Sequence, residues 1–292
     1  MKPAPFRLHR PASVEEAVTL LSDVAEEGGL ILAGGQSLVP MMALRVVYPP
    51  DLVDINAIKG LDRVVADGGR LTIGATARHA FFHRPVTTNR LGELLAAVSR
   101  YIAHYPIRLR GTFCGSLAHA DPASEWCLVA ATLGCGIVLA GKGGRRRTLP
   151  ARDYLRGAMT TAREADEMLI EAHCPLLPEG ATFGFYEFNR RAGDFALGMC
   201  LTTFAVVDGV MTGVRVGLGG IENSPRRLAA VEALLEGRAP SAAVFRQAAA
   251  AADDGLDPME DPATGADYRR GLAPVVIRRA LQFASDKAAA KV

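Results

Sequence analysis

The sequence predicts an α+β protein made of two parts. Segments with helical and with strand-like periodicity follow one another through the first 177 residues, and a strand hairpin with a helical end follows. The 292 residues suffice for two modest domains, each with its own core. A hydrophobic content of 49% and a charged content of 22% are typical of soluble globular proteins.

The first part begins with a well-marked helix. Ser13 can cap it, Glu16 follows three residues later, and apolar residues continue at helical spacing. Further elements are expected in this order along the chain: strands at 30–33, 51–55 and 70–73, a helix at 91–103, a loop rich in small residues at 111–116 and a second helix at 122–133.

Two hairpins complete the expected elements. Residues 136–140 and 146–149 form the first, and residues 201–207 and 210–218 form the second around Asp208-Gly209. Prolines and a glycine between 175 and 180 suggest a linker, so we expect domains at 1–177 and 178–292. The three arginines at 145–147 are interpreted as a solvated shoulder of the first hairpin rather than as a phosphate site.

Several classes of protein are disfavoured. A net charge of +2 gives no strong field for nucleic acid or membranes, the N-terminus has no secretory signal, and no apolar run is long enough to span a bilayer. Five cysteines without a Cys-x-x-Cys pair indicate reduced, buried thiols in a cytoplasmic protein, with no metal held by this chain. His79 and His83 have metal-ligand spacing but no evident third ligand, so we expect a surface pair.

Two glycine-bearing segments are the candidate ligand site. The first glycine segment, residues 32–38 (Leu-Ala-Gly-Gly-Gln-Ser-Leu), directly follows an expected strand. The second glycine segment, residues 110–122, contains Gly, Thr and Ser and leads toward a helix. Uncovered backbone N–H groups and hydroxyls suit a phosphate. Neither segment has a Walker A or Gly-x-Gly-x-x-Gly pattern, but together they favour a dinucleotide.

These residues carry a resemblance to a known family. Ala33-Gly34-Gly35-Gln36-Ser37-Leu38-Val39-Pro40 and the second glycine segment resemble the FAD-binding medium subunit of the carbon monoxide dehydrogenase and xanthine dehydrogenase family of molybdenum hydroxylases. Further similar motifs keep the family's order along nearly the whole chain: Asp54-Ile55-Asn56, Ile73-Gly74-Ala75, Asp166-Glu167-Met168-Leu169, Arg191-Ala192-Gly193-Asp194-Phe195-Ala196, Leu218-Gly219-Gly220 and Tyr268-Arg269-Arg270.

The resemblance implies a fold and a set of cofactor contacts. The fold would be a PCMH-type FAD-binding domain of two α+β subdomains, followed by a smaller C-terminal domain of antiparallel sheet plus helices. The residues implied for FAD binding in the two segments are Leu32, Ala33, Gly34, Gly35, Gln36, Ser37 and Leu38, which would hold the pyrophosphate, and Gly111, Thr112, Cys114, Gly115 and Ser116, which would form the second wall.

Four more positions are implied to lie near FAD. Glu125 would approach the adenosine half, and Ile102, Leu169 and Tyr186 would lie near the flavin, with Phe185 as an adjacent aromatic candidate. Cys114 departs from the family, which has glycine there. A side chain at that position requires a backbone without positive φ or a slightly shifted loop. A benign substitution and a thiol that changes redox behaviour both remain open.

The implied function is electron transfer within a complex. A large subunit would carry the molybdenum cofactor, a small subunit would carry [2Fe–2S] clusters, and the complex would be a dimer of heterotrimers. This subunit would accept electrons from the clusters and pass them through FAD to an external acceptor, without catalytic residues of its own. The alternatives are a stand-alone FAD-dependent oxidase and a flavin-free scaffold subunit of the same fold.

Overall fold

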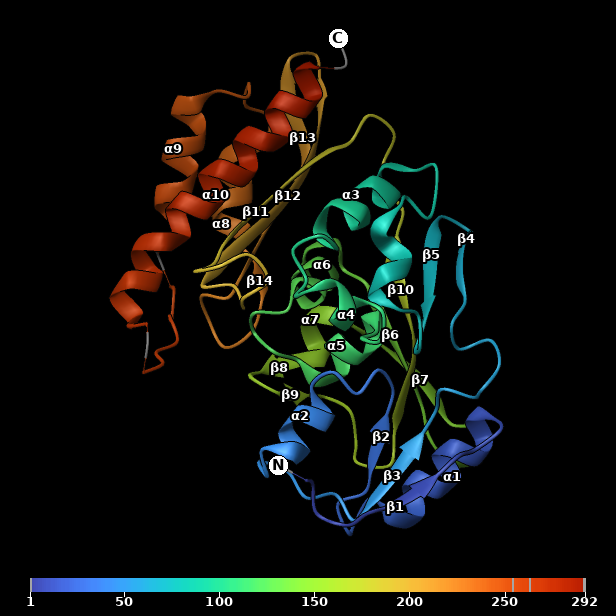
Figure 1. The fold of residues 1–292 in the computed structure, drawn as a ribbon. Coiled ribbons are helices and arrows are strands. Elements are labelled where there is room, and N and C mark those ends of the chain that lie inside the picture. The colour runs from blue at the N-terminus through green and yellow to red at the C-terminus, as the bar shows by residue number, and fades with distance from the viewer. Residues whose placement is uncertain (1, 254, 263, 291–292) are drawn as a thin grey trace.

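The computed structural model describes residues 2–253, 255–262 and 264–290. The chain begins with a three-stranded parallel sheet in the order β1-β3-β2, in which Leu52 of the central strand pairs with both Leu8 and Leu30 (Figure 1). The predicted helix cap is confirmed, because the Ser13 hydroxyl accepts a hydrogen bond from the Glu16 amide at 3.1 Å. The elements of this subdomain are β1 (Arg7–His9), α1 (Val14–Val24), β2 (Leu30–Leu32), α2 (Leu38–Ala43) and β3 (Asp51–Asp54).

The second subdomain is built on a five-stranded antiparallel sheet. Its order, β4-β5-β10-β6-β7, places the late strand β10 in the centre, and the first predicted hairpin forms the β6–β7 edge. Its strands are β4 (Val64–Asp67), β5 (Arg70–Gly74), β6 (Gly136–Ala140), β7 (Arg146–Pro150) and β10 (Met168–Pro175), with a small pair β8 (Leu155–Gly157) and β9 (Thr160–Thr161) beside it. Its helices and turns are η1 (His79–His83), α3 (Arg90–Val98), α4 (Tyr105–Arg108), α5 (Phe113–His119), α6 (Glu125–Leu133), η2 (Lys142–Gly144) and α7 (Ala151–Tyr154).

Two predicted elements of this subdomain differ from the structure. The helix expected to reach residue 103 ends at Val98, and Ala103 adopts a left-handed backbone with φ 41°. The loop expected at 111–116 is largely helical, since α5 starts at Phe113. Thr112 explains this helix, because its hydroxyl accepts from the Gly115 amide at 3.0 Å and so caps the first turn. Small residues concealed the helical periodicity here.

The C-terminal domain is a four-stranded antiparallel sheet with helices on its outer face (Figure 1). The predicted hairpin is confirmed, and Asp208 and Gly209 both have positive φ, as a tight two-residue turn requires. The elements are β11 (Thr182–Phe188), β12 (Gly198–Val207), β13 (Val210–Gly219), β14 (Arg226–Arg227), α8 (Ala229–Leu235), α9 (Ala242–Ala250), η3 (Ala251–Asp253) and α10 (Ala266–Ala289). None of the helices in the described residues has the length and hydropathy needed to cross a membrane.

The C-terminal sheet contributes to two hydrophobic cores. Phe183, Phe185 and Leu201 are buried in the large core of the first domain. Cys200 and Phe204 are buried with α8, α9 and α10 in a separate core. Side chains alternate between the two faces of a strand, so neighbouring residues of β11 and β12 face the first domain on one side and α8, α9 and α10 on the other. The sheet therefore joins the outer helices to the first domain.

A buried arginine on α10 provides a test of how the C-terminal domain is held. The Arg269 side chain is 3% exposed and donates to the carbonyl oxygens of Leu197 and Gly220 and to the carboxylate of Asp261. We expect Arg269→Ala to lower the free energy of unfolding by about 3 kcal/mol, because the carbonyl groups lose their donors in a buried position. Denaturant unfolding followed by circular dichroism measures the change. The exposed Arg278→Ala on the same helix is the control, and an equal loss in both variants would contradict the role of Arg269.

Candidate cofactor site

A cavity of about 380 Å³ lies between the N-terminal parallel sheet and the five-stranded sheet. The first glycine segment forms one side of it, and residues of the second glycine segment form the other. The predicted cofactor residues that border this cavity are Leu32, Ala33, Gly34, Gly35, Gln36, Ser37, Leu38, Gly111, Thr112, Cys114, Gly115, Ser116 and Leu169. The structure therefore brings together two segments that are more than 70 residues apart in the sequence.

The two glycine segments touch backbone to backbone. A Cβ atom on Gly34 would overlap the carbonyl oxygen of Arg110 and lie 2.8 Å from the Cα of Gly111. Such contacts are shorter than packed carbon atoms allow. Glycine at position 34 is thus required by the approach of the second segment. Gly35 is required for a different reason, since its φ of 69° is left-handed.

The first glycine segment leaves most of its backbone donors free and most of its acceptors occupied. In the described chain, the backbone N–H groups of residues 34–38 have no hydrogen-bond acceptor. By contrast, the carbonyl of Gly34 accepts from the Gln36 side chain, and the carbonyls of Gly35 and Ser37 accept from amides of the following helix. Consecutive free N–H groups form an anion-binding concavity. This side of the cavity therefore suits a pyrophosphate.

Two side chains tie the segments together. Asn56 donates to the carbonyl of Ala33 at 2.8 Å and accepts from Arg78 at 2.6 Å. Arg78 also donates to the carbonyl of Arg110 in the second segment. Burial and the nearby charge of Arg110 lower the pKa of Arg78, which still leaves it cationic at neutral pH. The bridge fixes the spacing of the two walls and adds positive charge beside them.

Cys114 is accommodated without backbone strain. It lies inside α5, where the backbone is helical, so the glycine of relatives is dispensable at this position. The side chain is 2% exposed, and its thiol lies 3.5 Å from the carbonyl oxygen of Ile73. Burial raises the pKa of the thiol well above its usual value. Cys114 is therefore a protonated thiol next to the cavity, which favours the benign interpretation of the substitution.

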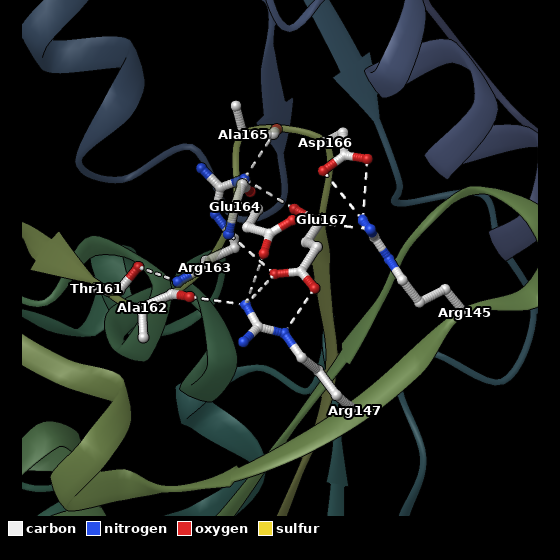
Figure 2. A network of polar contacts seen from close by, with 9 residues as sticks. All are labelled: Arg145, Arg147, Thr161, Ala162, Arg163, Glu164, Ala165, Asp166 and Glu167. Atoms are coloured by element: carbon white, nitrogen blue, oxygen red, sulfur yellow. Dashed lines mark hydrogen bonds and ion pairs between the residues drawn. The ribbon is translucent and has the colours of Figure 1, made fainter.

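Two arginines, Arg145 just before β7 and Arg147 within it, are paired with the acidic residues that precede β10 (Figure 2). Arg147 makes a two-fold contact with the carboxylate of Glu167, at 2.7 and 2.6 Å, and Arg145 contacts Asp166 at 3.0 Å. Glu167 is 1% exposed. Burial would raise its pKa, but hydrogen bonds from Arg147 and from the Glu164 amide lower the pKa below its usual value. The Arg147 side chain remains 35% exposed, as the expected solvated shoulder requires, and it also holds a buried carboxylate.

This network shapes one rim of the cavity. Arg163 donates from one Nη atom to the carbonyls of Glu164, Ala165 and Glu167, which closes residues 163–167 into a compact loop (Figure 2). Arg163, Glu167 and Leu169 all border the cavity. The loop therefore fixes the position of Leu169, one of the residues expected near the flavin.

We expected His79 and His83 to form a surface pair, and this expectation is wrong for His79. This side chain is 4% exposed and borders the cavity, because η1 turns inward behind the second glycine segment. His83 instead lies beside Tyr105, with ring centroids 5.6 Å apart. The i, i+4 spacing indicated a common helix face but could not show which way that face points. Among the described residues, no cluster of three or more His, Cys, Asp or Glu side chains could hold a metal.

Three predicted cofactor residues, Ile102, Tyr186 and Glu125, lie outside this cavity. Ile102 is buried between α3 and α4, and its carbonyl accepts from Arg108. Tyr186 packs on α10, with its hydroxyl 3.1 Å from Arg279. The adjacent Phe185 faces the first domain and contacts the ring of Tyr101 at 4.9 Å between centroids. Their roles, and that of Glu125 described next, remain predictions.

Glu125 at the start of α6 is close to Glu187 of β11. Burial raises the pKa of both carboxyl groups, and the charge of Glu125 further raises that of Glu187. Glu187 is 7% exposed; its Oε1 accepts from Asn189 at 2.9 Å, while its Oε2 has no partner in the described chain. Two acids from different domains thus share a poorly hydrated space, which favours protonation.

Sequence reasoning did not select several residues that border the cavity. These are the buried His79, Met159 in the β8–β9 turn, and the rim residues Arg163, Glu167 and Met168. Glu167 and Met168 belong to a motif that carried the resemblance, so their position was available as a signal. Met159 and Arg163 carried no such signal, because only the packing of the β8–β9 turn brings them to the cavity.

The fold and the site define a protein that binds an anionic dinucleotide between α+β subdomains. Comparison with known families agrees. Residues 4–177 match the model for the FAD binding domain in molybdopterin dehydrogenase, and residues 183–284 match the CO dehydrogenase flavoprotein C-terminal domain. The chain therefore belongs to the family of FAD-binding medium subunits of molybdenum hydroxylases.

Individual relatives support this assignment over the whole chain. The nicotine 6-hydroxylase medium subunit of Paenarthrobacter nicotinovorans is 36% identical, with 96% of this chain and 98% of the relative covered. The carbon monoxide dehydrogenase medium chain of Hydrogenophaga pseudoflava is 33% identical, with 97% and 98% covered.

Solved structures have the same fold. Carbon monoxide dehydrogenase from Hydrogenophaga pseudoflava matches with a TM-score of 0.93 and 34% identity, covering 98% of this chain and 99% of that one. Quinoline 2-oxidoreductase from Pseudomonas putida 86 matches with a TM-score of 0.93 and 33% identity, covering 99% of each chain. This protein is thus an oxidoreductase subunit with an FAD-binding domain.

The contact between the glycine segments can be tested at Gly34. We expect Gly34→Ala to weaken FAD binding by about tenfold or more, because the added methyl group pushes the two walls apart. Equilibrium dialysis or flavin fluorescence measures the dissociation constant. Gly271→Ala is the matched control: a Cβ there meets nothing within 4 Å, and a helical glycine replaced by alanine gains about 0.5–1 kcal/mol. Unchanged FAD affinity in Gly34→Ala would contradict this assignment.

The acidic pair predicts a pH dependence. The native state binds a proton at Glu187 more tightly than the unfolded chain, so stability falls as the pH rises above 4.5, the ordinary value for this group. We expect the melting temperature to fall by roughly 3–5 °C per pH unit while Glu187 titrates, and Glu187→Gln to reduce this slope to the part that Glu125 contributes. Thermal unfolding from pH 5 to 9 measures it. The exposed Glu179→Gln should retain the wild-type slope; a slope unchanged in Glu187→Gln would disprove the effect.

Proposed function

We propose that this chain is the electron-transfer subunit of a multi-subunit molybdenum hydroxylase. It would accept electrons from [2Fe–2S] clusters of a small partner subunit and pass them to an external acceptor. A large subunit with a molybdenum cofactor would oxidise the substrate, and two heterotrimers would form the complex. Whole-length similarity to a nicotine 6-hydroxylase medium subunit and a carbon monoxide dehydrogenase medium chain supports this proposal. The cytoplasm is the proposed location.

The proposed division of the chain follows from its cores. Residues 1–177 would form the FAD-binding domain, and residues 178–292 would form the C-terminal domain. The first domain has the cavity and both glycine segments. The C-terminal sheet buries one face against that domain and the other beneath α8, α9 and α10. In this proposal the second domain supports the site rather than recognising a separate organic substrate.

The main observation in support of this cofactor site is the row of backbone N–H groups in the first glycine segment that have no acceptor among the described residues. In the proposed arrangement, the N–H groups of residues 34–38 hold the FAD pyrophosphate without any side-chain charge. Gly111, Thr112, Cys114, Gly115 and Ser116 would form the opposite wall. Leu169 and Ile102 would offer apolar contacts to the flavin, with Tyr186 and Glu125 as further predicted contacts. Bound FAD supplies the exchange between one-electron and two-electron transfer.

The residues of this chain would position and insulate the cofactor. The Asn56–Arg78 bridge holds the two walls at a fixed distance, and the Arg147–Glu167 pair fixes the rim that contains Leu169. Buried apolar side chains under the site exclude water. No acid or base in the cavity is needed for electron transfer, so this proposal assigns no catalytic residue to the chain.

The proposal predicts where electrons enter. In the assembled complex under anaerobic conditions, the organic substrate should bleach flavin absorbance and change the cluster signals. The isolated chain loaded with FAD should not be reduced by the same substrate, because it would have neither molybdenum nor clusters. Dithionite, which should reduce the flavin in both samples, is the control. Direct reduction of the isolated chain by substrate would overturn the proposal in favour of a stand-alone oxidase.

A further inference from the structure

His79 occupies a position between the core and the cofactor cavity. Its backbone amide donates to the carbonyl of Gly111 at 2.9 Å, so the residue is tied to the second glycine segment. Its ring is almost completely buried and borders the cavity. The ring also explains the need for glycine at 111, because a Cβ there would lie 2.5 Å from the Nε2 of His79. Nε2 therefore adjoins the backbone that forms the second wall.

The indole of Trp126 determines which ring nitrogen of His79 has the hydrogen. The Nε1 of Trp126 can only donate, and it lies 2.9 Å from the Nδ1 of His79. Nδ1 must therefore accept, and in the neutral ring the hydrogen is on Nε2. Trp126 is fully buried in α6 and packs against Phe82 and Phe113, so the donor is held in place.

The ring remains neutral. Burial, with the positive charges of Arg108 and Arg78, lowers the pKa of His79 to about 3. At physiological pH the side chain is thus a neutral donor with its N–H at Nε2. In the described chain, the one hydrogen bond of this ring is that from Trp126 to Nδ1, and Nε2 donates to no group of the protein. Nε2 is not sealed in the core, so a group in the cavity can reach it.

The surroundings of Nε2 indicate what the acceptor is. Gly111 lies against both Nε2 and Gly34, so the imidazole borders the cavity beside the point where the two glycine segments meet, and the row of free amides begins there at Gly34. A group that accepts from these amides is an anion, and an oxygen of the same anion is the natural acceptor for Nε2. A neutral imidazole donor adds a hydrogen bond at this point without another positive charge beside Arg78.

We propose that His79 is a further cofactor-binding residue, whose Nε2–H donates to the pyrophosphate of bound FAD, and that Trp126 is the positioning residue that fixes this tautomer. The inference rests on the proposed cofactor site. It assigns a role to a residue outside both glycine segments, and it makes the Trp126–His79 pair a link between the core helix α6 and the ligand.

The first experiment separates hydrogen bonding from packing. His79→Leu removes the donor, whereas His79→Gln keeps an N–H at a similar reach. We expect His79→Leu to weaken FAD binding by about ten- to a hundredfold and to shift the ³¹P resonances of bound FAD, and His79→Gln to restore affinity to within about threefold of wild type. Flavin titration of the apoprotein and ³¹P NMR measure these changes, in the complex with its partners if the isolated chain releases FAD.

The outcomes distinguish the possible failures. Equal affinity and unchanged ³¹P resonances in His79→Leu would overturn the role of His79. Equal losses in the leucine and glutamine variants, matched by equal losses of apoprotein stability in thermal unfolding, would show a structural role only and would also overturn it. A wild-type protein that binds no FAD would instead contradict the cofactor site itself.

The second experiment tests the tautomer. In ¹⁵N NMR of the wild-type protein, the His79 ring should have a protonated Nε2 and an unprotonated Nδ1 from pH 5 to 8. Trp126→Phe removes the donor to Nδ1, and we expect a mixture of tautomers with FAD binding weakened by about threefold. In the His79→Leu background the same change at Trp126 should have no further effect on affinity. The opposite tautomer in the wild-type protein, or full additivity of the two substitutions, would overturn the proposal.

Discussion

The site depends on the direct contact between Gly34 and the backbone of Arg110 and Gly111. No side chain fits between the two glycine segments, because a Cβ on Gly34 would overlap the carbonyl of Arg110. The walls of the cavity can therefore approach more closely than any packed pair of side chains would allow. This contact also joins the two subdomains, since the first segment follows β2 of the parallel sheet and the second leads into α5 beside the five-stranded sheet.

Around this contact, most carbonyl groups of the first glycine segment are hydrogen-bonded within the described residues, whereas most of its N–H groups are not. Side chains and helix amides satisfy the carbonyls of residues 33–35 and 37, whereas the N–H groups of residues 34–38 are left free in the described chain. A loop with both groups unsatisfied would attract water as readily as an anion. Here the N–H groups of residues 34–38 remain against the single carbonyl of Gln36, so donors predominate and the loop favours an acceptor-rich ligand before any charged side chain is considered. Asn56 and Arg78 orient this backbone, and in this way they would influence the affinity for the ligand.

The sequence predicted the parts of the structure that depend on local chemistry. Ser13 with Glu16 marked a helix start, Asp208-Gly209 marked a hairpin, and the glycine segments marked the walls of the cavity. It did not predict features that depend on which way an element faces in the tertiary structure. The Thr112 cap made a helix of an expected loop, the inward turn of η1 buried His79, and the alternation of β11 directed Phe185 and Tyr186 to opposite faces. Nor did the sequence show that Arg147, on its solvated shoulder, pairs with Glu167 twenty residues later.

The C-terminal sheet packs against both the first domain and its own helices, so the stability of the cofactor domain depends on it. Phe183, Phe185 and Leu201 come from the second domain but belong to the core that underlies the first. Cutting the chain near residue 177 would expose this apolar surface and would also remove Glu187 from the space beside Glu125. The shape of the site is therefore a property of both domains, although the residues that line the cavity all come from the first. A truncated chain that lost its flavin would therefore show the effect of the missing core, and not the loss of a ligand contact.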